Sequence, residues 1–225
     1  LSPNTVLKLN SFLKSAFNYA VLNDMIKTNP TDRVSLPKKT KYKPLVYKEE
    51  QFFKLLSYVE DTEDEIPIVL GGGCGYRRGE IFGLYWRNID FKNNTIEIEQ
   101  TAVRFTKNIE KSPKNDTSRR KNSAPAYVML ILKKYYIAKG CPDKDTKVIT
   151  SWKPASYSER FGKLLEKFNL PHTRLHDLRH YNAVVMLKYG VSNKVAAERL
   201  GHAQVSTLTE IYQHVFDEMD KEAAG

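Results

Sequence analysis

Cysteine is scarce in this chain of 225 residues, and its two cysteines, Cys74 and Cys141, do not form a CxxC pair. This argues against a disulfide framework and against a zinc site built from cysteines. The sequence also lacks an apolar run near the ~20 residues of a membrane-spanning helix, and its first residues do not join a basic stretch to a hydrophobic one. We therefore expect a cytoplasmic protein that is neither secreted nor inserted in a membrane.

Acidic residues are outnumbered, because 36 lysines and arginines face 26 aspartates and glutamates and leave a net charge of +10. Such an excess indicates a polyanionic partner, either nucleic acid or an anionic membrane. The basic residues cluster at 37–48 and at 104–121. A single basic run also fits a solvated linker, but two runs favour phosphate contacts. The candidates for such contacts are Lys38, Lys39, Lys41, Lys43, Arg119, Arg120 and Lys121.

Hydrophobic spacing predicts a mostly helical α+β protein. Residues 3–27 form an amphipathic helix that ends at Asn29-Pro30, and a Pro- and Lys-rich linker follows, with a domain boundary near 37–46. Beyond it, we predict helices at 48–59, 64–70, 77–86, 128–139, 154–168, 176–189, 192–200 and 206–216, a hairpin at 89–100, and strands at 123–127 and 147–150. Three glycines at 71–73 weaken the prediction of the helix before them.

The segment LHDLRH at 175–180 places a guanidinium and two imidazoles in the first turn of a helix that is otherwise apolar nearly all round. His176, Arg179 and His180 fall on one side of the helical wheel. A helix with this pattern is buried, and a buried charge needs an anionic partner. That partner is either a carboxylate, such as Asp177, or a phosphate of the substrate.

Three other segments carry side chains suited to anion chemistry, and each has a structural alternative. GYRRGE at 75–80 spaces Arg77 and Glu80 three residues apart at a helix start, which also fits an intrahelical ion pair. Gly201 is typical of a glycine that ends a helix, so His202 lies beyond the last carbonyls and either caps them or donates to a ligand. Tyr212 lies in a predicted helix, with Leu208 and Val215 near helical spacing, which by itself is typical of a core residue.

The sequences GYRRGEIFGLYW and TRLHDLRHYNAVVMLKYGVSNKVAAERLGHAQVSTLTEIYQHV resemble the tyrosine recombinases, especially the integrases of phages and conjugative transposons. The resemblance covers nearly the whole chain, and the order R…HxxR…GH…Y is specific. The family's catalytic lysine lies in a β-hairpin between the first arginine and HxxR, where Lys114 is the best match and Lys111 and Lys121 lie close by. The remaining matches to catalytic residues are Arg77, His176, Arg179, His202 and Tyr212.

The resemblance implies site-specific cleavage and rejoining of DNA without metal, ATP or another cofactor. Tyr212 would attack a phosphodiester to form a covalent 3′-phosphotyrosine, while Arg77 and Arg179 stabilise the charge of the transition state. His202 would donate a hydrogen bond, His176 would accept the phenol proton or hold the phosphate, and a lysine would protonate the departing 5′-oxygen. We therefore expect a DNA recombinase with no metal site.

The resemblance also implies a fold and a set of partners. Residues 1–36 would be the end of an all-helical core-binding domain, 37–45 a basic linker, and 46–225 a tyrosine-recombinase-like catalytic domain with a small antiparallel sheet. The expected partner is double-stranded DNA, bound by a homo-tetramer on paired recombination sites, with the tail at 215–225 packed on a neighbouring subunit. Accessory proteins that bend DNA or set direction are further candidate partners, and a membrane is not.

Three other functions share part of this evidence. A type IB topoisomerase uses the same chemistry, and differs in whether the joined strands come from one duplex or two. A non-catalytic DNA-binding regulator on the same scaffold is disfavoured because every catalytic position is occupied. A metallohydrolase would use His176 and His180, spaced four apart as in HExxH, but no clear third ligand appears.

Overall fold

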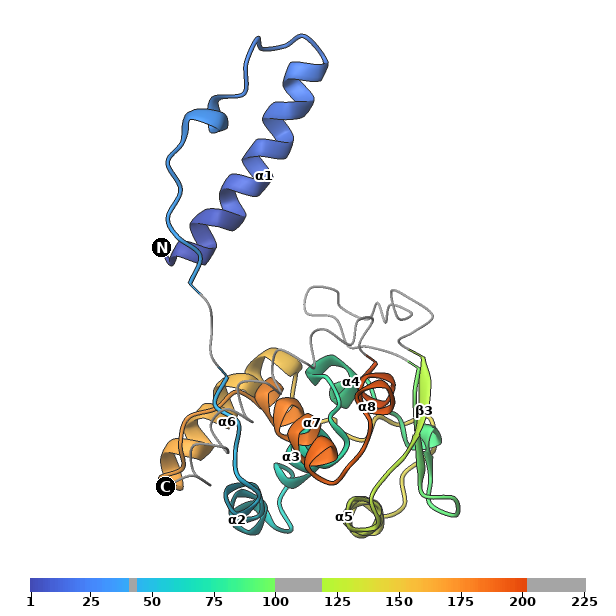
Figure 1. Ribbon diagram of the computed structural model, residues 1–225. Helices are drawn as coiled ribbons and strands as arrows, with labels where there is room; N and C mark the ends of the chain where they lie inside the picture. Colours follow the sequence, from blue (N-terminus) through green and yellow to red (C-terminus); the bar gives the residue numbers. More distant parts are fainter. Residues whose placement is uncertain (41–43, 100–118, 202–225) are drawn as a thin grey trace. The chain divides into compact units, whose positions relative to one another are not determined.

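The computed structural model describes residues 1–40, 44–99 and 119–201. The chain divides into two compact units, Leu1–Lys43 and Pro44–Gly225 (Figure 1). Within the described ranges, no helix has both the length and the apolar character that crossing a bilayer requires. The helix predicted at 206–216 lies outside the described residues.

The first unit consists of the helix α1, Pro3–Leu22, and the short 3-10 helix η1, Pro30–Arg33. The Ser2 side chain caps the start of α1 by accepting a hydrogen bond from the Thr5 amide. None of the residues of α1 is buried, and Phe12 is 77% exposed. The predicted helix at 3–27 is therefore present but ends five residues earlier than expected.

The second unit is organised around the helix α3, Glu65–Cys74, in which every residue is buried. This helix contacts α2 (Glu49–Val59), α5 (Ala126–Ala138) and α7 (Leu178–Lys188), which surround it in Figure 1. The amide of Asn182 on α7 donates to the carbonyls of Gly72 and Gly73, at 2.9 and 3.0 Å. The end of α3 is thus tied to α7 by side-chain hydrogen bonds as well as by packing.

The glycines at 71–73 do not interrupt α3, which extends four residues beyond the predicted end. They allow neighbouring helices to approach closely, because a Cβ on Gly72 would lie 2.1 Å from the ring of Phe52. The helix ends at Gly75, whose φ of 68° lies in the left-handed region that glycine adopts without strain. The chain then turns into the short helix α4, Arg78–Phe82.

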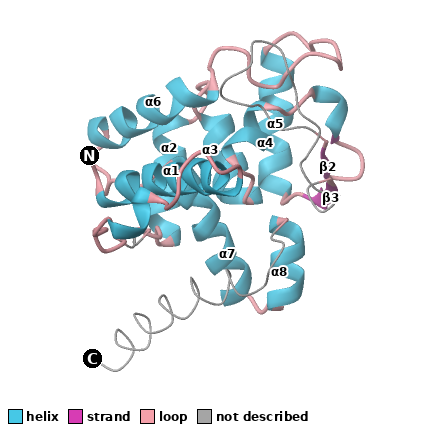
Figure 2. Cartoon of the chain, turned by 90° about the horizontal axis from the view of Figure 1, so that it is seen from above, coloured by secondary structure: helices cyan, strands magenta, loops and turns pink. Residues whose placement is uncertain are grey.

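A three-stranded antiparallel sheet lies on one side of the second unit, away from the helix α6, Pro154–Lys167 (Figures 1 and 2). The strands β1 (Ile89–Asp90) and β2 (Thr95–Ile98) form the predicted hairpin, and β3 (Arg120–Ser123) pairs with β2. The outer face of β3 is polar, as is common at a sheet edge.

Three local predictions were wrong. The helix expected at 77–86 covers only Arg78–Phe82, and a 3-10 helix η2, Trp86–Asn88, follows it. The strand expected at 123–127 lies at Arg120–Ser123 instead, because the chain enters α5 at Ala126. The strand expected at 147–150 is reduced to an isolated bridge between Tyr85 and Lys147.

The last described elements follow the prediction closely. The segment at 176–189 forms a 3-10 turn η4, Leu175–Asp177, that continues into α7, and the next helix is α8, Asn193–Leu200. The Ser192 side chain caps α8 by accepting from the Val195 amide. Gly201, with a φ of 65°, ends α8 as expected. Figure 2 shows α7 and α8 next to each other, and the two helices are in contact.

Candidate functional site

Arg77 stands directly before α4, in extended conformation, and reaches two segments of the chain. Its guanidinium donates to Oε1 of Glu80 at 2.8 Å, which is the intrahelical ion pair considered for this motif. Its other terminal nitrogen donates to the carbonyl of Gly201 at 2.5 Å. The Arg77 side chain is 36% exposed.

Arg179 lies in the first turn of α7 and is only 2% exposed. Its guanidinium donates to the carbonyl of Gly75 at 2.7 Å and to that of Leu200 at 2.5 Å. Asp177, the carboxylate suggested as its partner, instead accepts hydrogen bonds from Nε and Nη2 of Arg174, each at 2.9 Å. Within the described residues, the buried charge of Arg179 is therefore held by neutral carbonyls and not by a carboxylate.

Glu80 is the acidic centre of the site and is 2% exposed. Both of its oxygens accept hydrogen bonds from Arg120, and Oε2 also accepts from the backbone amide of Arg77 at 2.9 Å. Burial alone would raise the pKa of this carboxyl, but the hydrogen bonds and charges of Arg120 and Arg77 outweigh it and lower the pKa. Glu80 is thus ionised at neutral pH.

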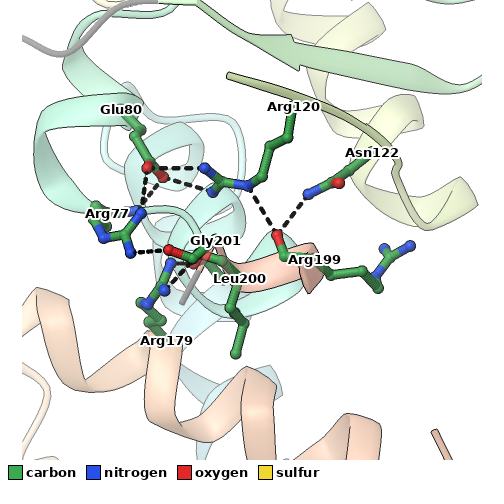
Figure 3. Close-up of polar contacts among 9 residues, drawn as sticks. Arg77, Glu80, Arg120, Asn122, Arg179, Arg199, Leu200 and Gly201 are labelled. Carbon is green, nitrogen blue, oxygen red and sulfur yellow. Dashed lines mark hydrogen bonds and ion pairs between the residues drawn. The ribbon is translucent and has the colours of Figure 1, made fainter. Parts of the chain in front are cut away.

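Three consecutive carbonyls at the end of α8 receive side chains from three other parts of the unit (Figure 3). The carbonyl of Arg199 accepts from Arg120 and Asn122, that of Leu200 from Arg179, and that of Gly201 from Arg77. The two guanidinium groups from α7 and from the start of α4 therefore meet around one turn of chain. His202 follows that turn directly in the sequence.

Arg120 was predicted among the basic residues that contact DNA phosphates, and the structure places its side chain inside the second unit. Its side chain is 8% exposed and binds Glu80 with two nitrogens, at 3.0 and 2.8 Å. Its neighbour Arg119 is 67% exposed and lies 3.5 Å from the carboxylates of Glu97 and Glu99. Lys121 is exposed as well. Successive side chains along a strand point to opposite faces, so Arg120 points inward while Arg119 and Lys121 point outward.

His176 and His180 lie close together at the junction of η4 and α7. Their rings meet edge to face, with centroids 5.5 Å apart, and Nε2 of His180 lies 3.8 Å from the Asp177 carboxylate. Desolvation, followed by the charges of His180 and Arg179, lowers the pKa of His176 to about 4, although the residue as a whole is exposed. The imidazole of His176 is therefore neutral at neutral pH, and one of its ring nitrogens can accept a hydrogen bond.

Burial and the neighbouring arginines lower the pKa of Arg179 to about 9. The guanidinium therefore keeps its charge at neutral pH, in a place where that charge is costly to desolvate. Arg77 and Arg120 bind the carboxylate of Glu80, and the charge of Arg179 interacts with Glu80 and with both of these arginines without a hydrogen bond to the carboxylate. Among the described side chains of this cluster, positive charge is in excess, which favours an anionic ligand.

The remaining predicted residues divide into two groups. Lys38 and Lys39 are exposed in the first unit. Within the described residues, no three His, Cys, Asp or Glu side chains gather to hold a metal ion. Five predicted residues lie outside the described residues, namely Lys41, Lys43, Lys114, His202 and Tyr212.

Sequence reasoning missed the parts of the site that depend on where β3 begins. Arg120 and Asn122 are two residues apart, and both reach the carbonyl of Arg199. Alternation along a strand beginning at Arg120 would have placed them on one face, inside, with Arg119 and Lys121 outside. The carbonyls of α8 carry no sequence signal, because every residue type supplies the same backbone acceptor.

Residues 46–219 match the sequence profile of the phage integrase family. A tyrosine recombinase XerC-like protein of Caldanaerobacter subterraneus is 26% identical, over 95% of this chain and 63% of its own length. The ICEBs1 integrase of Bacillus subtilis is 25% identical, over 100% of this chain and 65% of its own. The chain thus spans a little under two thirds of the length of these two curated relatives.

Solved structures show the same fold at lower sequence identity. The Tn1549 transposon integrase in complex with transposon right end DNA has a TM-score of 0.78 at 23% identity, covering 99% of this chain and 80% of that one. A lambda integrase dimer bound to a core site has a TM-score of 0.66 at 18% identity, covering 90% of this chain and 57% of that one. The mostly helical α+β fold with a small antiparallel sheet, predicted from the sequence, is confirmed.

Proposed function

Because this chain belongs to the phage integrase family, we propose that it is a site-specific DNA recombinase that works through a covalent 3′-phosphotyrosine at Tyr212. Its substrate would be double-stranded DNA, as in the complexes of the Tn1549 and lambda integrases. In this assignment, residues 1–36 end a core-binding domain, 37–45 form a linker and 46–225 form the catalytic domain. We propose a tetramer on paired sites as the active assembly, with accessory DNA-bending proteins as candidate partners.

The charge balance around Glu80 is the observation that carries this proposal. Three guanidinium groups and one carboxylate leave a surplus of two positive charges among these side chains. A phosphodiester carries one negative charge, and the phosphorane-like transition state of its cleavage gains a second. Preorganised positive charge of this size stabilises the transition state more than the ground state, which is the requirement for catalysis.

The positions of Arg77 and Arg179 support their assignment as the pair that grips the phosphate. They bind the carbonyls of Gly201 and Leu200, which belong to adjacent residues. The two guanidiniums therefore lie at the same turn and their charges interact, an arrangement that suits them to bind one phosphate group. A carbonyl is a neutral acceptor, so a phosphate oxygen is the stronger partner for either arginine.

The proposed reaction is balanced in bonds and protons. The phenol oxygen of Tyr212 forms a bond to phosphorus while the bond from phosphorus to the 5′-oxygen breaks, and His176 accepts the phenol proton. Lys114 gives a proton to the 5′-oxygen, and His202 donates a hydrogen bond to the phosphate. The phosphotyrosine retains the energy of the broken bond, so a 5′-hydroxyl of another strand reverses the step without ATP or a divalent metal.

Covalent capture tests this function without knowledge of the target sequence. A pool of nicked suicide duplexes with a randomised centre is incubated with the protein in EDTA, and DNA that stays bound in denaturant is recovered and sequenced. We expect an adduct with the wild-type protein and none with Tyr212→Phe. Tyr189→Phe, which alters a phenol that is 68% exposed, is the matched control and should retain the adduct.

Two results would contradict the proposal: no adduct from any DNA in the pool, or an adduct that survives Tyr212→Phe. An adduct whose strands are rejoined only within one duplex would instead identify a type IB topoisomerase. Strand exchange between two labelled copies of the selected duplex distinguishes the two activities.

A further inference from the structure

Arg120 is held by protein atoms at every nitrogen of its guanidinium. Nε donates to the carbonyl of Arg199 at 2.9 Å, while Nη1 and Nη2 donate to the two oxygens of Glu80 at 3.0 and 2.8 Å. The side chain is 8% exposed, and its guanidinium lies 5.7 Å from the ring centre of Tyr76. With all three nitrogens bound to protein atoms, Arg120 is suited to hold other residues in place and not to contact DNA.

The first group that Arg120 holds is the carboxylate that orients Arg77. Oε1 of Glu80 accepts from both Arg120 and Arg77, and Oε2 accepts from Arg120 and from the Arg77 amide (Figure 3). A carboxylate bound by a bidentate guanidinium has a fixed plane and direction. The position of the Arg77 guanidinium therefore depends on the fork supplied by Arg120.

The second group that Arg120 holds is the turn at the end of α8, to which Arg77 is also bound. The carbonyl of Arg199 accepts from Arg120 and, at 2.7 Å, from Asn122 on the same face of β3. Two residues later, the carbonyl of Gly201 accepts from Arg77. Arg120 also packs against this turn, because a Cβ on Gly201 would lie 2.9 Å from its Nη1.

Both routes lead from Arg120 to the guanidinium of Arg77. We infer that Arg120 is a positioning residue for the recombination reaction, which fixes Arg77 through Glu80 and through the turn at Gly201 and does not itself contact DNA. The inference rests on the proposed function, because it assigns Arg77 to the phosphate. A displacement of a catalytic group by about 1 Å lowers a rate by up to about 100-fold, so a residue of this kind acts on rate and not on DNA affinity.

The test compares Arg120→Lys with a matched substitution away from the site. Arg160 on α6 makes the same kind of contact, since Nε and Nη2 bind the two oxygens of Asp64, whose side chain is 5% exposed. Arg160→Lys thus also replaces a bidentate guanidinium on a buried carboxylate by an ammonium. The assay measures single-turnover adduct formation on the captured DNA over a range of protein concentrations, which separates the maximal rate from the half-saturating concentration.

For Arg120→Lys, we expect the maximal rate to fall by about tenfold or more, and the half-saturating concentration to stay within about twofold of the wild type. Arg160→Lys should change neither value by more than about twofold, because Arg160 binds Asp64 and none of the residues around Arg77. In an Arg77→Lys background, Arg120→Lys should lower the rate much less than it does in the wild type, since both act on one group.

Three results would overturn the inference. If Arg120→Lys raised the half-saturating concentration and left the maximal rate unchanged, Arg120 would contact DNA. An equal loss of rate in Arg160→Lys would mean a general effect of folding. Full additivity with Arg77→Lys would mean that Arg120 does not act through Arg77. If Arg120→Lys fails to fold, Asn122→Ala tests the route through the turn, because Asn122 donates to the same carbonyl of Arg199. A smaller fall in maximal rate is expected at unchanged half-saturation, and an unchanged maximal rate would contradict that route. Absence of an adduct with the wild-type protein would contradict the proposed function itself.

Discussion

The glycines of α3 lead to a prediction that distinguishes neighbouring positions. In an exposed helix, Gly→Ala stabilises by about 1 kcal/mol, because alanine loses less backbone entropy. A Cβ on Gly71 would meet its nearest neighbour at 3.6 Å, an ordinary contact, whereas one on Gly72 would lie 2.1 Å from the ring of Phe52. The two substitutions should therefore have opposite signs.

The size of the effect at Gly72 follows from the rigidity of its neighbour. Phe52 is fully buried and packs against Tyr181 with ring centroids 4.5 Å apart, so the ring cannot move aside freely. Overpacking of a core costs about 1–3 kcal/mol, and the upper value less the gain in helix propensity leaves a net loss of about 2 kcal/mol. Gly71→Ala keeps the gain and should stabilise by up to about 1 kcal/mol.

Urea unfolding followed by tryptophan fluorescence measures this difference in the intact chain. Both tryptophans, Trp86 and Trp152, lie in the second unit, so the signal reports the unit that contains α3. We expect a lower midpoint for Gly72→Ala and an equal or higher one for Gly71→Ala. Equal midpoints for the two variants, or a gain in stability for Gly72→Ala, would refute the packing derived for α3.

Three other predictions concern charge. The pKa of His176 is lowered to about 4 from an ordinary 6.5, so as pH falls the unfolded chain binds the proton before the folded chain does. The free energy of unfolding should therefore decrease as pH falls from about 6.5 to about 4. In His176→Asn, the plot of this free energy against pH should have a shallower slope over the same range. Glu80→Gln leaves buried guanidinium charge unbalanced and should lower the free energy of unfolding by about 3 kcal/mol, measured in urea, with a loss under 1 kcal/mol contradicting this role. If Lys38 and Lys39, both exposed, bind phosphates, the double Gln variant should reduce the slope of log affinity against log salt by about 2, and an unchanged slope would exclude them.

The sequence was most informative where a pattern repeats over several turns. The amphipathic spacing in 154–168 and 192–200 predicted α6 and α8 to within a residue or two at each end. The HxxR segment correctly indicated a buried arginine at the start of a helix. The partners of this arginine, Arg179, could not be predicted. It binds carbonyls from distant segments, while the nearby carboxylate of Asp177 pairs with Arg174.

The errors near β3 have a common physical origin. The edge strand β3 has the sequence RKNS, in which all four residues are polar, so it carries no alternation of apolar and polar residues. Without a known start for the strand, the inward direction of Arg120 could not be inferred. The pairing with β2, which sets this direction, depends on residues more than twenty positions away.

Arg179 has a consequence for the two helices that it joins. Its guanidinium bonds the carbonyl just after α3 and the last carbonyl of α8, so one cation faces the negative dipole ends of both helices. An anion that binds this guanidinium competes for the same charge and weakens its attraction to both ends. Binding of an anion and attachment of the two helices therefore compete for one guanidinium. If Arg179 binds the phosphate as proposed, its substitution will change stability and reaction rate together.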